Sequence, residues 1–364
     1  MKYRLFLAVV VFVLVPFLIV FRVSGTPTAP APAPTPAVET SSSTSLRSLA
    51  QKRGFSIGAG VELAPLQNDP NYGSVLAREF NLLVPENAFK FDDLHPKRDR
   101  YDFRKLDRFF AFAKANNMLV RGSPLVWHYA LPSWLNEGNF TRDELLAIMR
   151  EHIQTLVSRY RGQVFAWDVV NEALNRDGSL KDTIWLRQIG PEYIDLAYRW
   201  AHEADPQARL FYSDYQNEEL GRKADAMYTM VKGLLQRGVP IHGVGFQSHR
   251  GLKNPPDLES HAKNIKRFGE LGVEVQFTEL DIKIAEGTGS TEERLAAQAR
   301  TYGDLLQVCL RAQNCSAFIT WGFTDRYTWI SGTTGELDAP LIFDKSYQPK
   351  PAYNTIKEVL NSGV

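Results

Sequence analysis

The stretch Phe165-Ala166-Trp167-Asp168-Val169-Val170-Asn171-Glu172 is a short apolar run that ends in an amide and a carboxylate. From Gly54 onward the chain repeats this arrangement, because each β-rich apolar run is followed by an amphipathic helical stretch. The eight runs begin at Phe55-Ser56-Ile57-Gly58, Leu82-Leu83-Val84, Leu119-Val120-Arg121-Gly122, Phe165-Ala166-Trp167, Leu210-Phe211-Tyr212, Val244-Gly245-Phe246, Val275-Gln276-Phe277 and Ala317-Phe318-Ile319. Eight strands with intervening helices predict a closed parallel (β/α)8 TIM barrel of the α/β class, about 250 residues or longer.

Two of the helical stretches carry clear start signals. Thr141 is followed three residues later by Glu144, and Ser290 by Glu293, which is the pattern of a capping box. Apolar residues at helical spacing then follow, namely Leu145, Met149, Ile153, Leu156 and Tyr160 in the first and Leu295, Ala299, Tyr302 and Leu306 in the second. The barrel fills residues 46–364, and no second folded domain is expected.

Residues 1–23 are predicted to be a signal peptide or an uncleaved signal anchor. Lys2 and Arg4 precede an apolar run over residues 5–21, which Arg22 closes. These 17 residues would span roughly 26 Å as a helix, just short of a hydrocarbon core of about 30 Å. The apolar centre of a cleaved signal is usually shorter, at about 7–15 residues, so both alternatives stay open. In either case the positive end stays inside and the rest is exported.

Residues 24–45 are predicted to be a linker between this leader and the barrel. They contain five Pro, five Ser, five Thr and four Ala with Glu39 as the single charge. Such a composition cannot bury a core, and it favours an extended spacer. A tail without a role is the alternative that the sequence leaves open.

The composition of the folded part excludes several classes of protein. Because Lys2, Arg4, Arg22 and Glu39 are the charged residues of the first 45, 39 basic and 40 acidic residues remain. A domain so close to neutral has no basic field for nucleic acid. The two cysteines exclude a disulfide-rich scaffold and a Cys-rich zinc module. Neither a His-Glu-x-x-His motif nor a Gly-rich phosphate cradle occurs, so we expect no metal and no cofactor.

Carboxylates at the strand ends suggest the chemistry, because active sites on this fold lie at the C-terminal ends of the strands. Glu172 and Glu279 follow the fourth and seventh runs. Acid-assisted cleavage of a glycosidic bond needs two carboxyl groups, one to protonate the departing oxygen and one to attack or to activate water. A carboxylate at this edge is, alternatively, often only an ion-pair partner for Lys or Arg.

His249 and Asp281 are expected to support Glu279. Asp281 follows Glu279 by two residues, so on a strand both face the same way. His249, at the end of the sixth run, could then bridge the two carboxylates by hydrogen bonds. Such bonds would orient Glu279 and lower its pKa, as a nucleophile needs. The alternative for His249 is a satisfied polar group at the edge of the core.

Aromatic and polar side chains at the strand ends suit a sugar ligand. An indole ring stacks on the apolar face of a sugar while its N–H donates, which is the expectation for Trp127, Trp321 and Trp329. Trp167, Trp185 and Trp200 are instead expected in the core. The candidate partners for sugar hydroxyls are Glu86, Asn87, Lys90, His128, Asn171, Tyr215 and Gln247.

Five motifs, taken together and in this order, resemble the glycoside hydrolase family 10 endo-1,4-β-xylanases. They are Leu125-Val126-Trp127-His128, Asp168-Val169-Val170-Asn171-Glu172, Gly245-Phe246-Gln247-Ser248-His249, Thr278-Glu279-Leu280-Asp281 and Trp321-Gly322-Phe323-Thr324-Asp325. The resemblance extends from Leu46 to about Ser362. It implies a retaining hydrolase of xylan and xylooligosaccharides, with Glu172 as acid/base and Glu279 as nucleophile.

The resemblance has further implications and some departures. It implies that the candidate residues listed above line xylose-binding subsites and that Cys309 and Cys315 are bonded. Tyr129-Ala130 stand where the family usually has Ser-Gln, and Ser213 stands where Asn is usual. These departures affect the expected substrate preference and the affinities of the subsites, and they leave the expected reaction class unchanged. We expect an exported monomer, tethered to the membrane if residues 5–21 remain uncleaved.

Two rival functions stay open at this stage. The first is a related barrel glycosidase that cuts glucan or mannan. The second is a non-catalytic carbohydrate-binding barrel, or an inhibitor built on the same fold. It predicts the loss of at least one carboxylate, whereas both are present.

Overall fold

The computed structural model describes residues 44–330 and 338–363. The expected leader, residues 1–23, and nearly all of the expected linker, residues 24–45, therefore lie outside the described part. Within the described ranges, no helix is long and apolar enough to cross a membrane.

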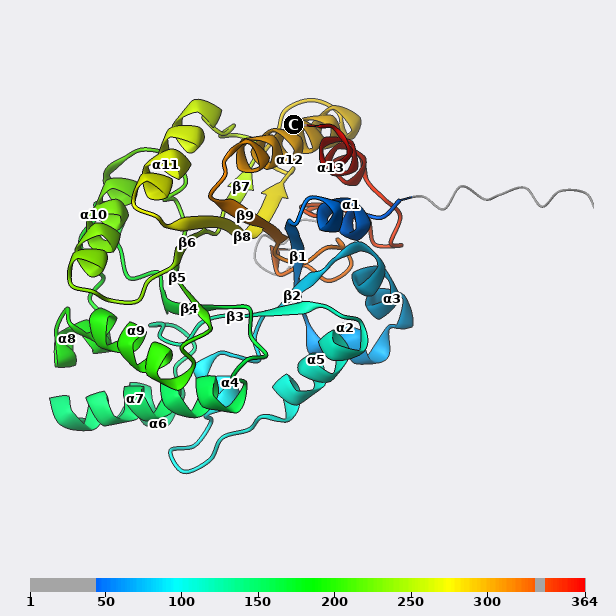
Figure 1. The fold of residues 1–364 in the computed structure, drawn as a ribbon. Coiled ribbons are helices and arrows are strands. Elements are labelled where there is room, and N and C mark those ends of the chain that lie inside the picture. Colours follow the sequence, from blue (N-terminus) through cyan, green and yellow to red (C-terminus); the bar gives the residue numbers. More distant parts are fainter. Residues whose placement is uncertain (1–43, 331–337, 364) are drawn as a thin grey trace, which may run out of the picture. The chain divides into compact units, whose positions relative to one another are not determined.

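Eight parallel strands form a closed barrel (Figure 1). They are β1 (Ser56–Val61), β2 (Leu82–Pro85), β3 (Leu119–Gly122), β4 (Ala166–Asn171), β5 (Arg209–Asp214), β6 (Gly243–Phe246), β8 (Glu274–Lys283) and β9 (Cys315–Thr320). Sequential neighbours pair in parallel, and the pairing of β1 with β9 closes the ring. Each of the eight apolar runs forms a strand, so the predicted (β/α)8 barrel is confirmed.

The helices cover the outside of the barrel in Figure 1. They are α1 (Leu46–Lys52), α2 (Leu63–Asn68), α3 (Pro70–Glu79), α4 (Phe91–Leu94), α5 (Arg104–Ala115), α6 (Ser133–Asn136), α7 (Arg142–Arg159), α8 (Ile184–Ile189), α9 (Tyr193–Ala204), α10 (Arg222–Gln236), α11 (Leu258–Glu270), α12 (Thr291–Arg311) and α13 (Pro351–Asn361). Both predicted capping boxes are present, at Thr141 before α7 and at Ser290 before α12.

A short additional strand, β7 (His249–Gly251), was missed by the sequence analysis. Ser248 has a left-handed backbone with φ 61°, which turns the chain after β6. His249 then pairs with Asp281 in the far part of β8. The expectation that His249 simply ends the sixth strand was wrong, because this turn places it in a strand of its own.

The interior of the barrel contains apolar side chains and a buried cluster of the polar residues Arg121, Asp168 and Gln276. Arg121 on β3 pairs with Asp168 on β4 and donates to Gln276 on β8. Trp167 and Trp185 are completely buried and Trp200 nearly so, as expected. The buried charge pair therefore links the neighbouring strands β3 and β4, and the bond to Gln276 connects them to β8 on another side of the barrel.

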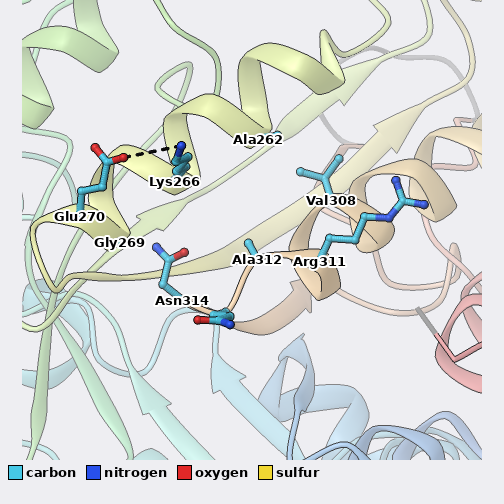
Figure 2. A pocket seen from close by; sticks show the side chains of 9 residues that line it. Ala262, Lys266, Gly269, Glu270, Val308, Arg311, Ala312 and Asn314 are labelled. Carbon is cyan, nitrogen blue, oxygen red and sulfur yellow. Dashed lines mark ion pairs between the residues drawn. The ribbon is translucent and has the colours of Figure 1, made fainter.

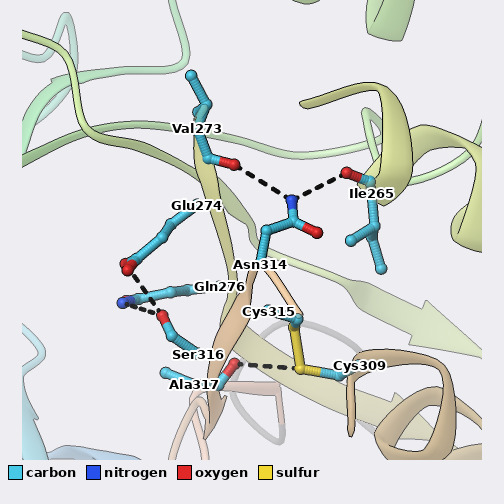
Figure 3. Close-up of a disulfide and its surroundings, with 9 residues drawn as sticks. All are labelled: Ile265, Val273, Glu274, Gln276, Cys309, Asn314, Cys315, Ser316 and Ala317. Carbon is cyan, nitrogen blue, oxygen red and sulfur yellow. Dashed lines mark hydrogen bonds between the residues drawn. A yellow bond between two sulfur atoms is a disulfide. The ribbon is translucent and has the colours of Figure 1, made fainter. Parts of the chain in front are cut away.

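The loop between α12 and β9 is fastened at the end of the barrel where the strands begin. Cys309 and Cys315 form a disulfide, and Asn314 donates to the carbonyls of Ile265 at 2.9 Å and Val273 at 3.1 Å (Figure 3). A pocket of about 480 Å³ lies beside this loop, between the ends of α11 and α12 (Figure 2). It lies away from the strand ends that carry Glu172 and Glu279, and its Lys266 and Glu270 pair with each other at 3.9 Å.

Candidate active site

The C-terminal ends of the strands surround a cavity of about 530 Å³. Most of the side chains that the sequence analysis selected line it, namely Glu86, Lys90, Trp127, Asn171, Glu172, Tyr215, Gln247, His249, Glu279, Trp321 and Trp329. Residues at or just after the ends of β2, β3, β4, β5, β6, β8 and β9 thus meet in one cleft, as the sequence analysis predicted.

Three selected residues do not line this cavity. Asp281 is completely buried behind His249. Asn87 lies behind Lys90, from which it accepts a hydrogen bond at 2.6 Å, and it donates to Glu62 at 2.5 Å. His128 is half-buried beside the cleft, and burial, together with the charge of Lys181, lowers its pKa to about 4. His128 is therefore neutral at neutral pH.

Glu172 is held at the wall of the cleft by contacts with both of its carboxylate oxygens. Oε1 accepts from Nε2 of Gln247 at 3.1 Å and from Nδ2 of Asn171 at 3.5 Å. Nζ of Lys181 lies 3.5 Å from Oε2. The backbone of Glu172 is in the left-handed region with φ 54°, and its N–H donates to the carbonyl of Ser213 at 2.9 Å.

Glu279 faces the same cleft but has a cationic partner of a different kind. Nε2 of His249 lies 3.2 Å from its Oε2, and Nδ1 of His249 lies 2.8 Å from Oδ2 of Asp281. Burial acts to lower the pKa of His249, but Asp281 and Glu279 outweigh it and raise that pKa well above its usual value. The imidazolium can therefore donate to both carboxylates at once. The expected bridge is present.

The expectation of a low pKa for Glu279 was wrong. Burial raises the pKa of Glu279, and the hydrogen bond and charge of His249 oppose that rise. The sequence analysis counted the bond from His249 but not the loss of water around a buried carboxyl group. The hydrogen bond and charge of His249 thus favour the anionic form of Glu279 against the effect of burial.

Gln247 connects the two carboxylate residues. Its side chain donates to Glu172, while its backbone carbonyl accepts from the N–H of Glu279 at 3.1 Å. One residue at the end of β6 therefore fixes the acid candidate from β4 relative to the nucleophile candidate from β8.

Two tryptophans and a carboxyl group shape the rest of the cleft. Trp329 is 45% exposed, so its ring is open to a ligand, and its Nε1–H donates to Asp281 at 2.9 Å. Trp127 lines the cavity, and its Nε1 is buried without a partner among the described residues. Burial, with Glu62 nearby, raises the pKa of Glu86 well above its usual value.

Several lining residues were missed because they lie in loops without a repeating pattern. Tyr129 is exposed at the rim, and Ser123, Pro124, Arg176 and Gln216 also line the cavity. Lys181 approaches Glu172 because the loop after β4 folds back on itself through the pairing of Leu174 with Leu180. The departure at Tyr129 was visible in the sequence, whereas nothing in the sequence signalled Lys181.

The arrangement suits acid–base chemistry on a carbohydrate. Within residues 44–330 and 338–363, no group of His, Cys, Asp or Glu side chains is arranged to hold a metal ion. One carboxyl group contacts a neutral amide and a lysine, and the other contacts an imidazolium.

Comparison with known proteins agrees with this geometry. The model of glycosyl hydrolase family 10 matches residues 45–359. Endo-1,4-beta-xylanase B of Thermotoga neapolitana is 44% identical over 320 residues, covering 86% of this chain and 91% of the relative. A beta-1,4-xylanase of Dictyoglomus thermophilum is 43% identical, covering 82% of this chain and 86% of the relative.

A solved structure of high similarity is xylanase 10B from Thermotoga petrophila in complex with xylobiose. It has a TM-score of 0.84 and 42% identity, and the match covers 87% of this chain and 97% of that one. The native xylanase 10B from Thermotoga maritima matches with the same TM-score of 0.84. The chain therefore belongs to glycosyl hydrolase family 10.

Proposed function

We propose that this protein is a retaining endo-1,4-β-xylanase that hydrolyses internal β-1,4-xylosidic bonds of xylan by double displacement. The observation that carries the proposal is the unequal pairing of the two carboxylates in one cleft: Glu279 has a cationic His249, and Glu172 has Gln247 and Lys181. The relatives named above, which are xylanases by name, support xylan as the substrate.

In the first displacement, Glu279 attacks the anomeric carbon and Glu172 protonates the departing oxygen. His249 holds Glu279 in its anionic form and directs one carboxylate oxygen into the cleft. The carboxyl group of Glu172 is held from the other side by Gln247. A glycosyl-enzyme ester on Glu279 is the product of this step.

In the second displacement, Glu172 accepts a proton from water, which attacks the ester and releases Glu279. Lys181, whose Nζ lies 3.5 Å from Oε2 of Glu172, helps to hold the carboxyl group in place for this step. Asn171, whose side chain lies beside Glu172, is placed to bond the 2-hydroxyl of the sugar. Retention of the anomeric configuration follows from two successive inversions.

The remaining lining residues form the binding subsites in this proposal. Trp321, Trp329 and Trp127 offer ring faces to xylose units, and Glu86 and Lys90 offer polar contacts to hydroxyl groups. Burial raises the pKa of Glu86 well above its usual value, which favours the protonated form that can donate as well as accept. Asn87 positions Lys90 from behind.

We also propose that the enzyme is exported as a monomer and that Cys309 and Cys315 are bonded after export. Oxidising conditions outside the cell allow the disulfide to form. If the run over residues 5–21 stays uncleaved, it tethers the barrel to the membrane. Full-length protein in membranes that carbonate does not release supports the tether, whereas a soluble form starting near Thr26 contradicts it.

Product analysis tests the proposed activity. The purified protein is incubated with xylan, carboxymethyl cellulose and mannan under the same conditions. We expect xylooligosaccharides from xylan and, by proton NMR, β-anomers as the first reducing ends. Faster release from cellulose or mannan would assign the chain to the rival glycosidase activity, and α-anomers appearing first would contradict retention.

A further inference from the structure

The backbone of Glu172 has a conformation that its neighbours must hold. Its φ of 54° lies in the left-handed region, which is unfavourable for a residue with a Cβ atom. The N–H of Ala173, the next residue, donates to the hydroxyl of Tyr212 on β5 at 3.0 Å. This bond fixes the peptide group that directly follows Glu172, so it sets the direction in which the carboxyl side chain leaves the backbone.

The hydroxyl of Tyr212 accepts this bond because its single proton is used elsewhere. It donates to Oδ2 of Asp214 at 2.6 Å, which leaves its lone pairs for the N–H of Ala173. Tyr212 and Asp214 are two residues apart on β5, so their side chains lie on the same face, and both are completely buried. The orientation of the phenol therefore depends on Asp214 acting as an acceptor.

Lys223 at the start of α10 supplies the charge that keeps Asp214 an acceptor. Its Nζ lies 2.6 Å from Oδ1 of Asp214, and the side chain is 3% exposed. Burial raises the pKa of Asp214, and Lys223 opposes that rise. This cation therefore favours the anionic form of Asp214, in which the carboxylate can only accept from Tyr212.

A contribution to folding stability does not by itself explain why the charged pair Asp214 and Lys223 is buried beside Tyr212. A buried ion pair often contributes no more to folding than well-packed apolar residues of the same volume. The chain of bonds ends on the peptide next to Glu172 and not at the surface. Its position indicates a role in orienting the acid/base residue.

We propose that Tyr212, Asp214 and Lys223 are positioning residues for Glu172, acting through the N–H of Ala173 to aim its carboxyl group at the departing oxygen. The inference rests on the proposed xylanase function. Gln247 and Lys181 contact the carboxylate of Glu172 itself. The series of hydrogen bonds from Lys223 through Asp214 and Tyr212 instead holds the backbone that carries this side chain. Losing this series of hydrogen bonds therefore weakens proton donation by Glu172 and leaves the nucleophile Glu279 unchanged.

The test compares two aryl β-xylobiosides that differ only in their need for an acid. Departure of 2,4-dinitrophenol needs little protonation, whereas departure of phenol needs much. We expect Tyr212→Phe to lower kcat/KM on the phenyl substrate about 10- to 100-fold, as a misaligned acid should. On the dinitrophenyl substrate the loss should stay below about threefold, because acid catalysis contributes little there.

The matched control is Tyr198→Phe, on α9. Tyr198 is also completely buried, but its hydroxyl has no partner among the described residues, so both substrates should react as with the unchanged protein. If Tyr212→Phe does not fold, Asp214→Asn and Lys223→Met allow the same comparison, and Lys223→Arg should retain activity. Equal losses on both substrates, or no loss on either, overturn the inference. If the protein without any substitution is inactive on both substrates, that result contradicts the proposed function and not this inference.

Discussion

Nζ of Lys181 lies 3.5 Å from Oε2 of Glu172, and the same ammonium group lies 4.9 Å from the centre of the Tyr215 ring. The position is set by the backbone, because the N–H of Lys181 donates to the carbonyl of Ala173 at 2.8 Å. A permanent positive charge thus lies beside the carboxyl group that has to act first as an acid and then as a base. This contact helps to hold Oε2 of Glu172 in place in both steps.

Replacing Lys181 by Met removes the charge and keeps most of the length of the side chain. Oε2 of Glu172 then loses a charged partner that helps to position it, so kcat/KM on xylan should fall about 10-fold, which corresponds to about 1.4 kcal/mol. Lys181→Arg keeps the charge and serves as the control. A kcat/KM of Lys181→Met equal to that of the unchanged protein would show that this cation does not act on Glu172.

His152 on α7 should make the fold sensitive to acid. It is buried, both ring nitrogens lack partners among the described residues, and its ring lies 3.8 Å from that of Phe91. Burial, with a smaller contribution from His95, lowers the pKa of His152 to about 3. In the unfolded chain its pKa is about 6.5, so between these values the unfolded state binds a proton that the folded state does not. Stability is therefore lost as the pH falls below about 6.5.

His152→Phe should remove this part of the pH dependence. When the pH is lowered from 7.5 to 5, the free energy of unfolding of the unchanged protein should fall by about 2 kcal/mol more than that of the variant. This difference comes from the single titrating group that the variant lacks. The measurement is the free energy of unfolding in denaturant at both pH values. The comparison between pH values is independent of whether the larger ring raises or lowers stability overall. Equal losses in both proteins would mean that His152 is protonated in the fold.

The two carboxylates should respond differently to truncation. Glu172→Ala removes the acid, so it should spare the first step for aryl xylosides with good leaving groups and impair that step on xylan by about 100-fold or more. Glu279→Ala removes the nucleophile, so it should abolish the first step for every substrate. Glu274→Ala is the control on the same strand, since Glu274 lies at the other end of β8 and pairs with Arg209. Equal damage to both kinds of substrate by Glu172→Ala would contradict its assignment as the acid.

The fold and much of the cleft were predictable because regular patterns carry them. Each barrel strand ends in polar residues, and parallel strands bring those ends together, so Glu172, Gln247 and Glu279 could be placed in one cleft before the structure was known. The capping boxes at Thr141 and Ser290 marked helix starts for a similar local reason. These features depend on residues close in sequence or on the period of a strand.

What the sequence analysis missed depends on loop geometry and on burial. Ser248 adopts a left-handed backbone that creates β7, and the loop after β4 folds back to bring Lys181 to Glu172. Neither event leaves a periodic pattern. The pKa of Glu279 was assigned in the wrong direction because the extent of its burial follows from the whole cleft and not from its neighbours in sequence.

Trapping of the glycosyl-enzyme tests the central claim most directly, namely that Glu279 is the nucleophile of a retaining xylanase. A 2-fluoro-xylobioside with a good leaving group should react once and then stall, because the fluorine slows release of the ester. Digestion and mass spectrometry should place the added mass on the peptide that contains Glu279, and Glu279→Ala should remain unlabelled. Inactivation with the added mass on another residue, or turnover without any covalent adduct in the active protein, would contradict the account.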